Sequence, residues 1–174
     1  MLKDISADDR PTARTPNPID SGVRIGHVHL KVADLERALR FYCGVLGFEV
    51  TQRRPGAAFI SAGGYHHHIG LNTWESCGGS PPPPGSTGLY HVAILYPTRA
   101  ALADALRRLM AANIPLEGAS DHGVSEALYL RDPDDNGVEL YWDRPQEQWP
   151  RTADGSLNMV TERLDLRDLL RAGE

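Results

Sequence analysis

Cysteine is scarce in this chain of 174 residues, which contains only Cys43 and Cys77. Small secreted domains that depend on disulfides need several cysteine pairs, so a disulfide framework is not expected to stabilise this fold. The sequence also shows no apolar signal segment. We therefore expect a cytoplasmic protein whose fold depends on hydrophobic packing.

Long apolar runs and an excess of positive charge are missing as well. No run approaches the roughly 20 apolar residues of a membrane-spanning helix, so we expect no membrane segment. Acidic residues number 23 against 18 lysines and arginines, which gives a net charge of -5. Without basic clusters, nucleic acid and anionic membranes are not the expected partners, and a small-molecule ligand is.

The two ends of the chain differ from its middle. Residues 1–22 are polar, contain several prolines and show no periodicity, which is typical of a flexible arm. Residues 144–174 read as a loop-like tail that carries one short helix. Between them, residues 23–143 carry regular apolar patterns, and 41% of the whole chain is hydrophobic, enough for one compact domain.

This middle region contains one pattern twice. Residues 23–75 begin with an alternating strand, IGHVHLKV, followed by an Asp34-capped amphipathic helix and three further strand candidates. Residues 88–143 repeat the order, starting with LYHVAILY and a helix capped by Thr98. The linker 76–87 contains four consecutive prolines, which cannot join a strand ladder. The sequence therefore predicts an α+β fold made of two tandem β-α-β-β-β repeats.

The second repeat ends in a predicted hairpin that carries unusual polar residues. Its turn, DPDDNG, is rich in residues that favour tight turns. Alternation places Glu139 and Tyr129 on the face opposite the aliphatic side chains of their strands. A water-facing edge residue is the ordinary interpretation of such a glutamate, and a rim position is the ordinary one for the tyrosine.

The histidines change this interpretation. His27 and His91 occupy corresponding positions in the two repeats, each opposite the aliphatic stripe, and Glu139 has the same relation to its own strand. A single histidine is more often a hydrogen-bonded structural residue than a ligand. Two imidazoles and one carboxylate on separate strands, however, are the donor set of non-haem Fe(II) oxygenases. We therefore predict a metal site formed by His27, His91 and Glu139, holding Fe(II), Mn(II) or another divalent ion.

The stretches IGHVHLKVADLERALRFYCGVLGF and LYHVAILY resemble the metal-bearing strands of the vicinal oxygen chelate superfamily. This superfamily includes glyoxalase I, fosfomycin-resistance proteins and type I extradiol dioxygenases. The resemblance covers residues 24–143 and implies a curved mixed sheet around a metal site. It also implies that His27, His91 and Glu139 are ligands of Fe(II).

A second resemblance lies in the stretch HGVSEALYLRDPDDNGVE, which is similar to the signature of extradiol dioxygenases. It departs from that signature at Ser120, two residues before His122, and at Asp135, where glycine or proline is expected. The resemblance implies that His122 and Tyr129 hydrogen-bond a bound catecholate and its oxygen intermediates. In the glyoxalase I-like members a fourth ligand, a glutamate, stands where this chain has Gly70.

The histidine that moves protons has two candidates. The stretch GYHHHIGLNTW resembles the strand that carries this residue in catechol 2,3-dioxygenase-like proteins, and its pattern nominates His67. Alternation along a straight strand nominates His68 instead, because His67 would share a face with Ile69 and Leu71. A β-bulge would reconcile the two. We choose His67 and keep His68 as the alternative.

The resemblance as a whole implies a non-haem Fe(II) extradiol dioxygenase that cleaves a catecholic ring with O₂. The alternatives are another enzyme of the superfamily, such as a metal-dependent thiol transferase or isomerase, or a non-catalytic protein that sequesters a drug or ligand. Repeats of this kind pair within one chain or across a dimer, and we expect a homo-oligomer, a dimer or larger. The identity of the catechol stays open.

Overall fold

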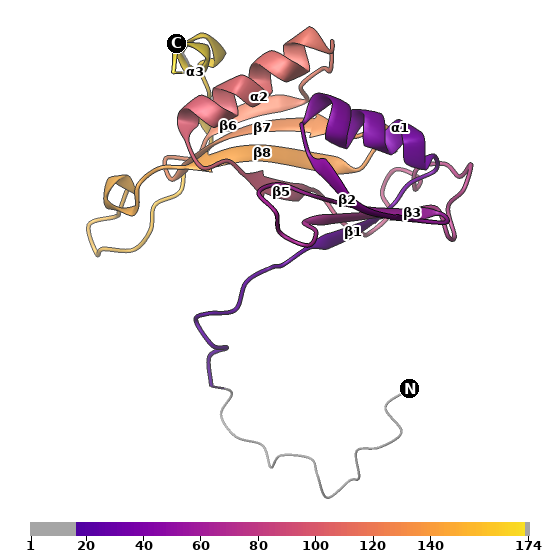
Figure 1. The fold of residues 1–174 in the computed structure, drawn as a ribbon. Coiled ribbons are helices and arrows are strands. Elements are labelled where there is room, and N and C mark those ends of the chain that lie inside the picture. Colours follow the sequence, from indigo (N-terminus) through magenta and orange to yellow (C-terminus); the bar gives the residue numbers. More distant parts are fainter. Residues whose placement is uncertain (1–16, 173–174) are drawn as a thin grey trace, which may run out of the picture.

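The computed structural model describes residues 17–172, so the predicted arm of residues 1–22 falls largely outside the described residues (Figure 1). In chain order the elements are β1 (Val28–Lys31), α1 (Leu35–Leu39), the π-helix η2 (Arg40–Val45), β2 (Glu49–Arg54), β3 (Ala57–Ser61), β4 (Ile69–Asn72), β5 (Val92–Leu95), α2 (Arg99–Ala111), β6 (Gly118–Asp121), β7 (Ser125–Arg131), β8 (Gly137–Asp143), the 3₁₀-helix η3 (Gln146–Gln148), β9 (Glu162–Arg163) and α3 (Leu166–Arg171).

The strands form two sheets with matching topology. The first has the order β1-β4-β3-β2 and the second the order β5-β8-β7-β6-β9. In each sheet the first strand pairs in parallel with the last strand of its unit, β1 with β4 and β5 with β8, and the other pairs are antiparallel. This confirms the predicted α+β class with two β-α-β-β-β units. The boundaries proposed for the repeats and their linker stay a prediction.

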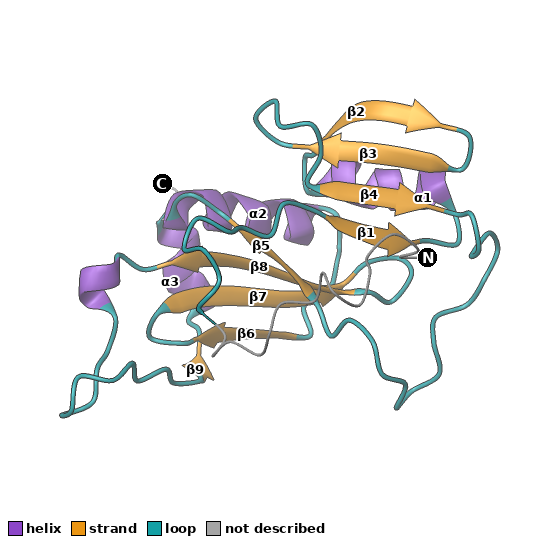
Figure 2. Cartoon of the chain, turned by 90° about the horizontal axis from the view of Figure 1, so that it is seen from below, coloured by secondary structure: helices purple, strands orange, loops and turns teal. Residues whose placement is uncertain are grey.

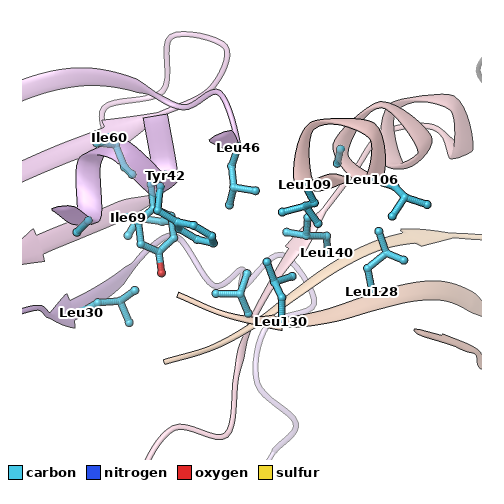
Figure 3. Packing of buried hydrophobic residues seen from close by; sticks show 14 of the residues in the cluster. Leu30, Tyr42, Leu46, Ile60, Ile69, Leu106, Leu109, Leu128, Leu130 and Leu140 are labelled. Atoms are coloured by element: carbon cyan, nitrogen blue, oxygen red, sulfur yellow. The ribbon is translucent and has the colours of Figure 1, made fainter. Parts of the chain in front are cut away.

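Helices α1 and α2 lie on the same side of the strands, above the sheets in Figure 1. The alternation seen in the sequence explains this arrangement, because the aliphatic residues of β1, β4, β7 and β8 are buried on the face that the helices cover. The buried residues of the two units form one hydrophobic cluster. Figure 3 shows Leu46 of the first unit opposite Leu109 and Leu140 of the second. The two units therefore share a core.

The turn of the β7-β8 hairpin joins the second unit to the first. The Tyr42 hydroxyl donates to Asp132 Oδ2 at 3.0 Å. Asp134 Oδ1 accepts from the backbone N–H of Ala33 at 2.8 Å and from Arg37 Nη2 at 2.6 Å. Burial, and secondarily the charge of Asp132, raises the pKa of Tyr42 well above its ordinary value, so Tyr42 stays a donor. The turn predicted from DPDDNG is thus a contact between the units.

The Asp34-capped helix predicted in the first repeat has the expected place and a different geometry. After α1 it continues as the π-helix η2, in which the Leu46 N–H donates to the carbonyl of Phe41 at 3.1 Å. The side chain of Asp34 caps α1, as the sequence predicts. The wider turn places the consecutive residues Phe41 and Tyr42 both in the core, 4% and 0% exposed. Tyr42 thereby reaches the hairpin turn of the other unit.

The C-terminal tail returns to the second sheet. Strand β9 pairs with β6, which covers the edge of that sheet. Helix α3 packs against α2 with Leu169 fully buried, and Arg99 on α2 forms an ion pair with Asp168 on α3 at 2.7 Å. In residues 17–172 no helix is long and apolar enough to cross a membrane.

Candidate functional site

The candidate residues of the second unit lie on the sheet face that points away from the helices. Leu128, Leu130 and Leu140 are buried against the helices, so the residues that alternate with them face the other way. Tyr129 and Glu139 are two such residues, and each is half-buried. Figure 2 views the molecule from this side, with the helices behind the strands.

Four predicted site residues are joined by hydrogen bonds. Tyr129 and Glu139 are directly opposite in the β7-β8 register, and the Tyr129 hydroxyl donates to Glu139 Oε1 at 3.0 Å. The other carboxylate oxygen, Oε2, lies 2.9 Å from Nε2 of His91. On the far side, Nε2 of His122 lies 2.8 Å from the Tyr129 hydroxyl. The structure therefore brings His91, Glu139, Tyr129 and His122 into one continuous chain.

Two more predicted residues meet on the first unit. The ring centroids of His27 and His67 are 4.4 Å apart. His67 also packs edge-on against Phe59 at 5.1 Å, and its Nδ1 lies 2.6 Å from Nδ1 of His66. His27 comes just before β1 and His67 just before β4, which are neighbouring strands. The proposed ligand His27 and the preferred proton-moving histidine are therefore in contact.

His68 points elsewhere. Its Nδ1 lies 3.0 Å from Ser61 Oγ and accepts from the backbone N–H of Ala62 at 3.3 Å. The bulge that the sequence argument invoked is absent from β4, which starts only at Ile69 and pairs with β3 in regular register. The loop before β4, rather than a bulge, turns His67 toward His27. The assignment of the proton-moving role to His67 or His68 stays a prediction, and the placement supports His67.

The protonation of the site follows from its surroundings. Burial, and then the neighbouring His27, lowers the pKa of His67, which favours the neutral imidazole. Burial together with the hydrogen bond to Glu139 raises the pKa of Tyr129 well above its ordinary value. Tyr129 is therefore a hydrogen-bond donor at neutral pH, and His67 is able to accept a proton.

The predicted metal ligands fit a divalent ion in residue type and only partly in arrangement. The 2.9 Å between His91 Nε2 and Glu139 Oε2 is a hydrogen-bond distance. It is also about the separation of two adjacent ligands with bonds of ~2.1 Å. By residue type, His27, His91 and Glu139 fit Fe(II) or Mn(II). However, residues 17–172 contain no group of three His, Cys, Asp or Glu side chains arranged to hold a metal ion. The structure thus brings two of the three predicted ligands together and leaves His27 beside His67.

The hydrogen bonds of His91 show which hydrogen a bound metal ion would replace. Its Nδ1 is buried and has no hydrogen-bond partner in the described part of the chain. A hydrogen on Nδ1 would be unsatisfied, so the neutral ring carries its hydrogen on Nε2, which donates to Glu139. A metal ion bound at Nε2 takes the place of this hydrogen. Metal-bound histidines usually donate from their other ring nitrogen, and that partner is missing here.

Aromatic side chains lie around His29, which is two residues after His27 at the start of the first unit. The ring of His29 is 5.4 Å from that of Trp74 and 6.0 Å from that of Phe59. His29 lies across Gly70, where an added Cβ would come within 2.9 Å of its ring. Glycine at position 70 therefore makes room for His29. The signal was present in the sequence, because His29 alternates in step with His27 and Gly70 lies in a strand.

The hollows found in the described residues lie elsewhere. One of about 700 Å³ is open to solvent and lined by β6 and the tail around Arg163–Arg167. A second, beside it, is lined by the charged residues Arg99, Glu126 and Arg144. In this network Glu126, only 2% exposed, accepts from Arg99 at 2.7 Å and Arg144 at 2.9 Å, so its buried charge is paired. None of the predicted site residues lines either hollow.

The comparison with known families agrees with the fold and the donor set. A profile of the Glyoxalase/Bleomycin resistance protein/Dioxygenase superfamily matches residues 24–140. This match covers more than half of the chain, and the chain belongs to this superfamily.

Individual relatives add detail. The chain is 43% identical over 152 residues to a catechol-2,3-dioxygenase of Bacillus subtilis, covering 87% of this chain and 53% of that protein. It is 34% identical over 122 residues to biphenyl-2,3-diol 1,2-dioxygenase 3 of Rhodococcus globerulus, covering 69% and 63%. The chain thus spans between about half and two thirds of the length of these relatives.

Solved structures show the same fold. A glyoxalase/dioxygenase from Nostoc punctiforme aligns with a TM-score of 0.61 at 18% identity, covering 77% of this chain and all of the other. A lactoylglutathione lyase from Agrobacterium tumefaciens aligns with a TM-score of 0.53 at 25% identity, covering 72% of this chain and 96% of the other. The fold is therefore common to members that carry different names.

Proposed function

We propose that this chain is an extradiol ring-cleaving dioxygenase, a non-haem Fe(II) enzyme that acts on a catecholic substrate with O₂. The observation that carries this proposal is the continuous chain of His91, Glu139, Tyr129 and His122 on one sheet face. The names of two relatives, a catechol and a biphenyldiol dioxygenase, support the same reaction class.

In this proposal His27, His91 and Glu139 hold the metal, which is Fe(II), with Mn(II) or another divalent ion as a substitute. His91 and Glu139 are already in contact, and in this proposal His27, which lies beside His67 on the other unit, would supply the third ligand. When bound, such an ion would be chelated by both oxygens of a catecholate and would supply a path for electrons from the substrate to O₂. A single carboxylate leaves net positive charge on the ion, which the substrate anion neutralises.

Tyr129 and His122 orient the substrate in this scheme. The Tyr129 hydroxyl has one hydrogen and lies within reach of both Glu139 Oε1 and His122 Nε2. Its raised pKa keeps that hydrogen in place at neutral pH. Tyr129 therefore donates to Glu139 or to a substrate oxygen, and His122 accepts or returns a proton behind it.

His67 is the residue proposed to move the substrate proton, with His68 as the alternative. The neutral imidazole of His67 takes a proton from a catechol hydroxyl and later returns it to the migrating oxygen. Its contact with His27 places it beside a proposed ligand, and Phe59 packs against its ring edge. His68 is held by Ser61, which makes it the weaker candidate.

The overall reaction balances without a further reductant. The ring bond next to the two hydroxyl-bearing carbons breaks, and both atoms of O₂ enter the ring-opened product. The catechol is the electron donor and O₂ the acceptor. The partners required are therefore a catechol and O₂ alone.

The proposal extends to assembly and organisation. We propose a homo-oligomer, in keeping with the exposed apolar residues Ile19, Val23 and Ile25 before β1, which are 76%, 54% and 97% exposed. We also keep the cytoplasmic location and the linker boundaries at residues 76–87 as proposals. Light scattering tests the first, and limited proteolysis within the linker tests the last.

The activity is tested by anaerobic reconstitution with Fe(II), addition of catechol and admission of air. We expect O₂ uptake and a yellow ring-opened product. Metal binding without uptake across several catechols would favour a thiol transferase or isomerase of the same superfamily. A stoichiometric ligand complex without metal would favour a sequestering protein.

A further inference from the structure

Val160 of the C-terminal tail contacts His122 through both its backbone N–H and its backbone carbonyl. The backbone N–H of Val160 donates to the carbonyl of His122 at 3.1 Å. In return, Nδ1 of the His122 ring lies 2.9 Å from the carbonyl oxygen of Val160. The hydroxyl of Thr161 is 3.3 Å from the same ring nitrogen. Val160 and Thr161 lie beyond residues 24–140, the part that matches the superfamily profile.

This contact determines which ring nitrogen carries the hydrogen. A carbonyl oxygen only accepts, so the 2.9 Å contact is a hydrogen bond only when Nδ1 of His122 is protonated. In the neutral ring, Nε2 then has its lone pair free, and it points at the Tyr129 hydroxyl 2.8 Å away. With the opposite tautomer, Nδ1 and the Val160 oxygen would face each other as two acceptors. The tail therefore selects the tautomer whose Nε2 can accept the single hydrogen of the Tyr129 hydroxyl, in competition with Glu139 Oε1.

A glycine allows the tail to come this close. Gly123, next to His122, has a φ of +73°, and its own N–H donates to Asp121 Oδ1 at 2.8 Å. An added Cβ would lie 2.9 Å from Pro150 Cγ and 3.3 Å from Val160 Cγ2. The carbonyl of Pro150 in turn accepts from Asn158 at 2.9 Å, which ties the two tail segments together. Any side chain at position 123 must push the tail away from His122.

We propose that the tail is a positioning element for the site, in which the Val160 carbonyl holds His122 in the Nδ1–H tautomer and aims Nε2 at Tyr129. The consequence for turnover rests on the proposed dioxygenase function. The tautomer itself does not, because it follows from the contacts of His122 alone. Val160 and Gly123 are positioning residues and touch no substrate in this scheme.

The direct test is the tautomer of His122 in the full chain, measured by ¹⁵N NMR of the imidazole rings. The signals are assigned by their loss in His122→Gln. We expect the neutral Nδ1–H form in the wild type and a mixture of tautomers in Gly123→Ala. The matched control is Gly155→Ala, because Gly155 has a φ of +85° with open space around it. It carries the same backbone strain without the contact and should leave His122 unchanged.

A second variant tests the same contact in case the Gly123→Ala protein does not fold. Val160→Pro removes the backbone N–H that donates to the His122 carbonyl, while the Val160 carbonyl position keeps its oxygen. We expect this variant also to show a mixture of His122 tautomers. An Nε2–H signal for His122 in the wild type, or identical spectra in Gly123→Ala, Val160→Pro and Gly155→Ala, would overturn the proposal.

Turnover separates this inference from the proposed function. With an active wild type, Gly123→Ala should lower kcat about 10- to 100-fold, as is usual when a partner that orients a site residue is lost. KM and metal content should change little. Equal kcat in Gly123→Ala and Gly155→Ala would contradict the positioning role. An inactive wild type with the Nδ1–H tautomer would instead contradict the dioxygenase and leave the tail contact in place.

Discussion

The two oxygens of the Glu139 carboxylate have different partners, His91 at one and Tyr129 at the other. A carboxylate inside a strand face is costly to bury unless each oxygen is satisfied. Here one oxygen meets a proposed metal ligand, and the other meets a hydroxyl that leads to His122. At the scale of single residues, Glu139 would therefore connect the proposed metal ligands with the proposed proton-moving groups.

Replacing Tyr129 by Phe removes the hydroxyl between Glu139 and His122 and keeps the ring. We expect turnover to fall about 10- to 100-fold while the metal is still bound, because the ligand set is intact. Metal analysis together with steady-state kinetics checks this. Tyr141→Phe, on the same face of β8, is the control and should retain activity. Loss of metal in Tyr129→Phe alone would show that the hydroxyl supports Glu139 as a ligand more than it orients substrate.

His27 and His67 are in contact and have different proposed roles. His27→Ala should abolish Fe(II) binding, since it removes one of three ligands. His67→Ala should keep the metal and slow turnover, since it removes only the group that moves protons. Iron content after gel filtration, read beside O₂ uptake, separates the two. If both variants lost the metal equally, the assigned roles would be wrong.

Alternation along the strands predicts which face a side chain takes, whereas groups without a sequence signal cannot be placed in this way. Tyr129 and Glu139 were predicted to leave the aliphatic face, and they face each other across β7 and β8. The choice between His67 and His68 needed the loop geometry before β4. The carbonyl of Val160 could not be predicted, because every residue has one and only the fold brings it to His122.

At the scale of elements, the hairpin turn after β7 has two roles. It reverses the chain, as its composition predicts, and it also binds the other unit, where Asp132 contacts Tyr42 of η2 and Asp134 contacts Arg37 of α1. The second role was not visible in the sequence. Contacts between residues about 90 positions apart depend on how the two units pack, which local patterns do not encode.

Tyr42→Phe tests this contact between the units. It leaves the ring in the core and removes a hydrogen bond to the buried Asp132, which is 5% exposed. We expect the free energy of unfolding to fall by about 1–3 kcal/mol, measured by urea denaturation. Tyr90→Phe, at a residue that is 81% exposed, is the control and should change it little. An equal effect of the two variants would show that the contact does not stabilise the fold.

Asp135 departs from the extradiol signature and has a φ of 65°. Most residues are strained in this left-handed region, and glycine is not. Asp135→Gly should therefore raise the free energy of unfolding by about 0.5–1 kcal/mol. Asp135→Ala removes the charge and keeps the Cβ, so it should bring no such gain. Equal stabilisation by both would point to the lost charge rather than to backbone strain.

At the scale of the whole molecule, the two β-α-β-β-β units behave as one body because their buried side chains form a single cluster. This much of the fold followed from the sequence, since both repeats carry the same alternation and helical spacing. The π-helix η2 and strand β9 did not. The apolar pattern of η2 is the same as that of a regular α-helix, so it does not reveal the π-helical geometry. Strand β9 is only two residues long, too short to show an alternating pattern.

A shared core predicts one unfolding transition for the two repeats. Thermal unfolding followed by near-UV and far-UV circular dichroism should give coincident curves, and calorimetry should give a single peak. Two separated transitions would show that the units fold independently. Fe(II) or Mn(II) should raise the Tm, because an ion that binds only the folded chain stabilises it.

The central claim is that this chain inserts both atoms of O₂ into a catechol at a site built on His27, His91 and Glu139. The most direct measurement couples O₂ consumption with mass spectrometry of the product, using the Fe(II)-reconstituted chain and Glu139→Gln as the control. The account predicts one O₂ consumed per catechol and a product heavier than catechol by the mass of one O₂, with neither seen for Glu139→Gln. Consumption of O₂ without oxygen in the product, or equal activity of Glu139→Gln, would contradict it.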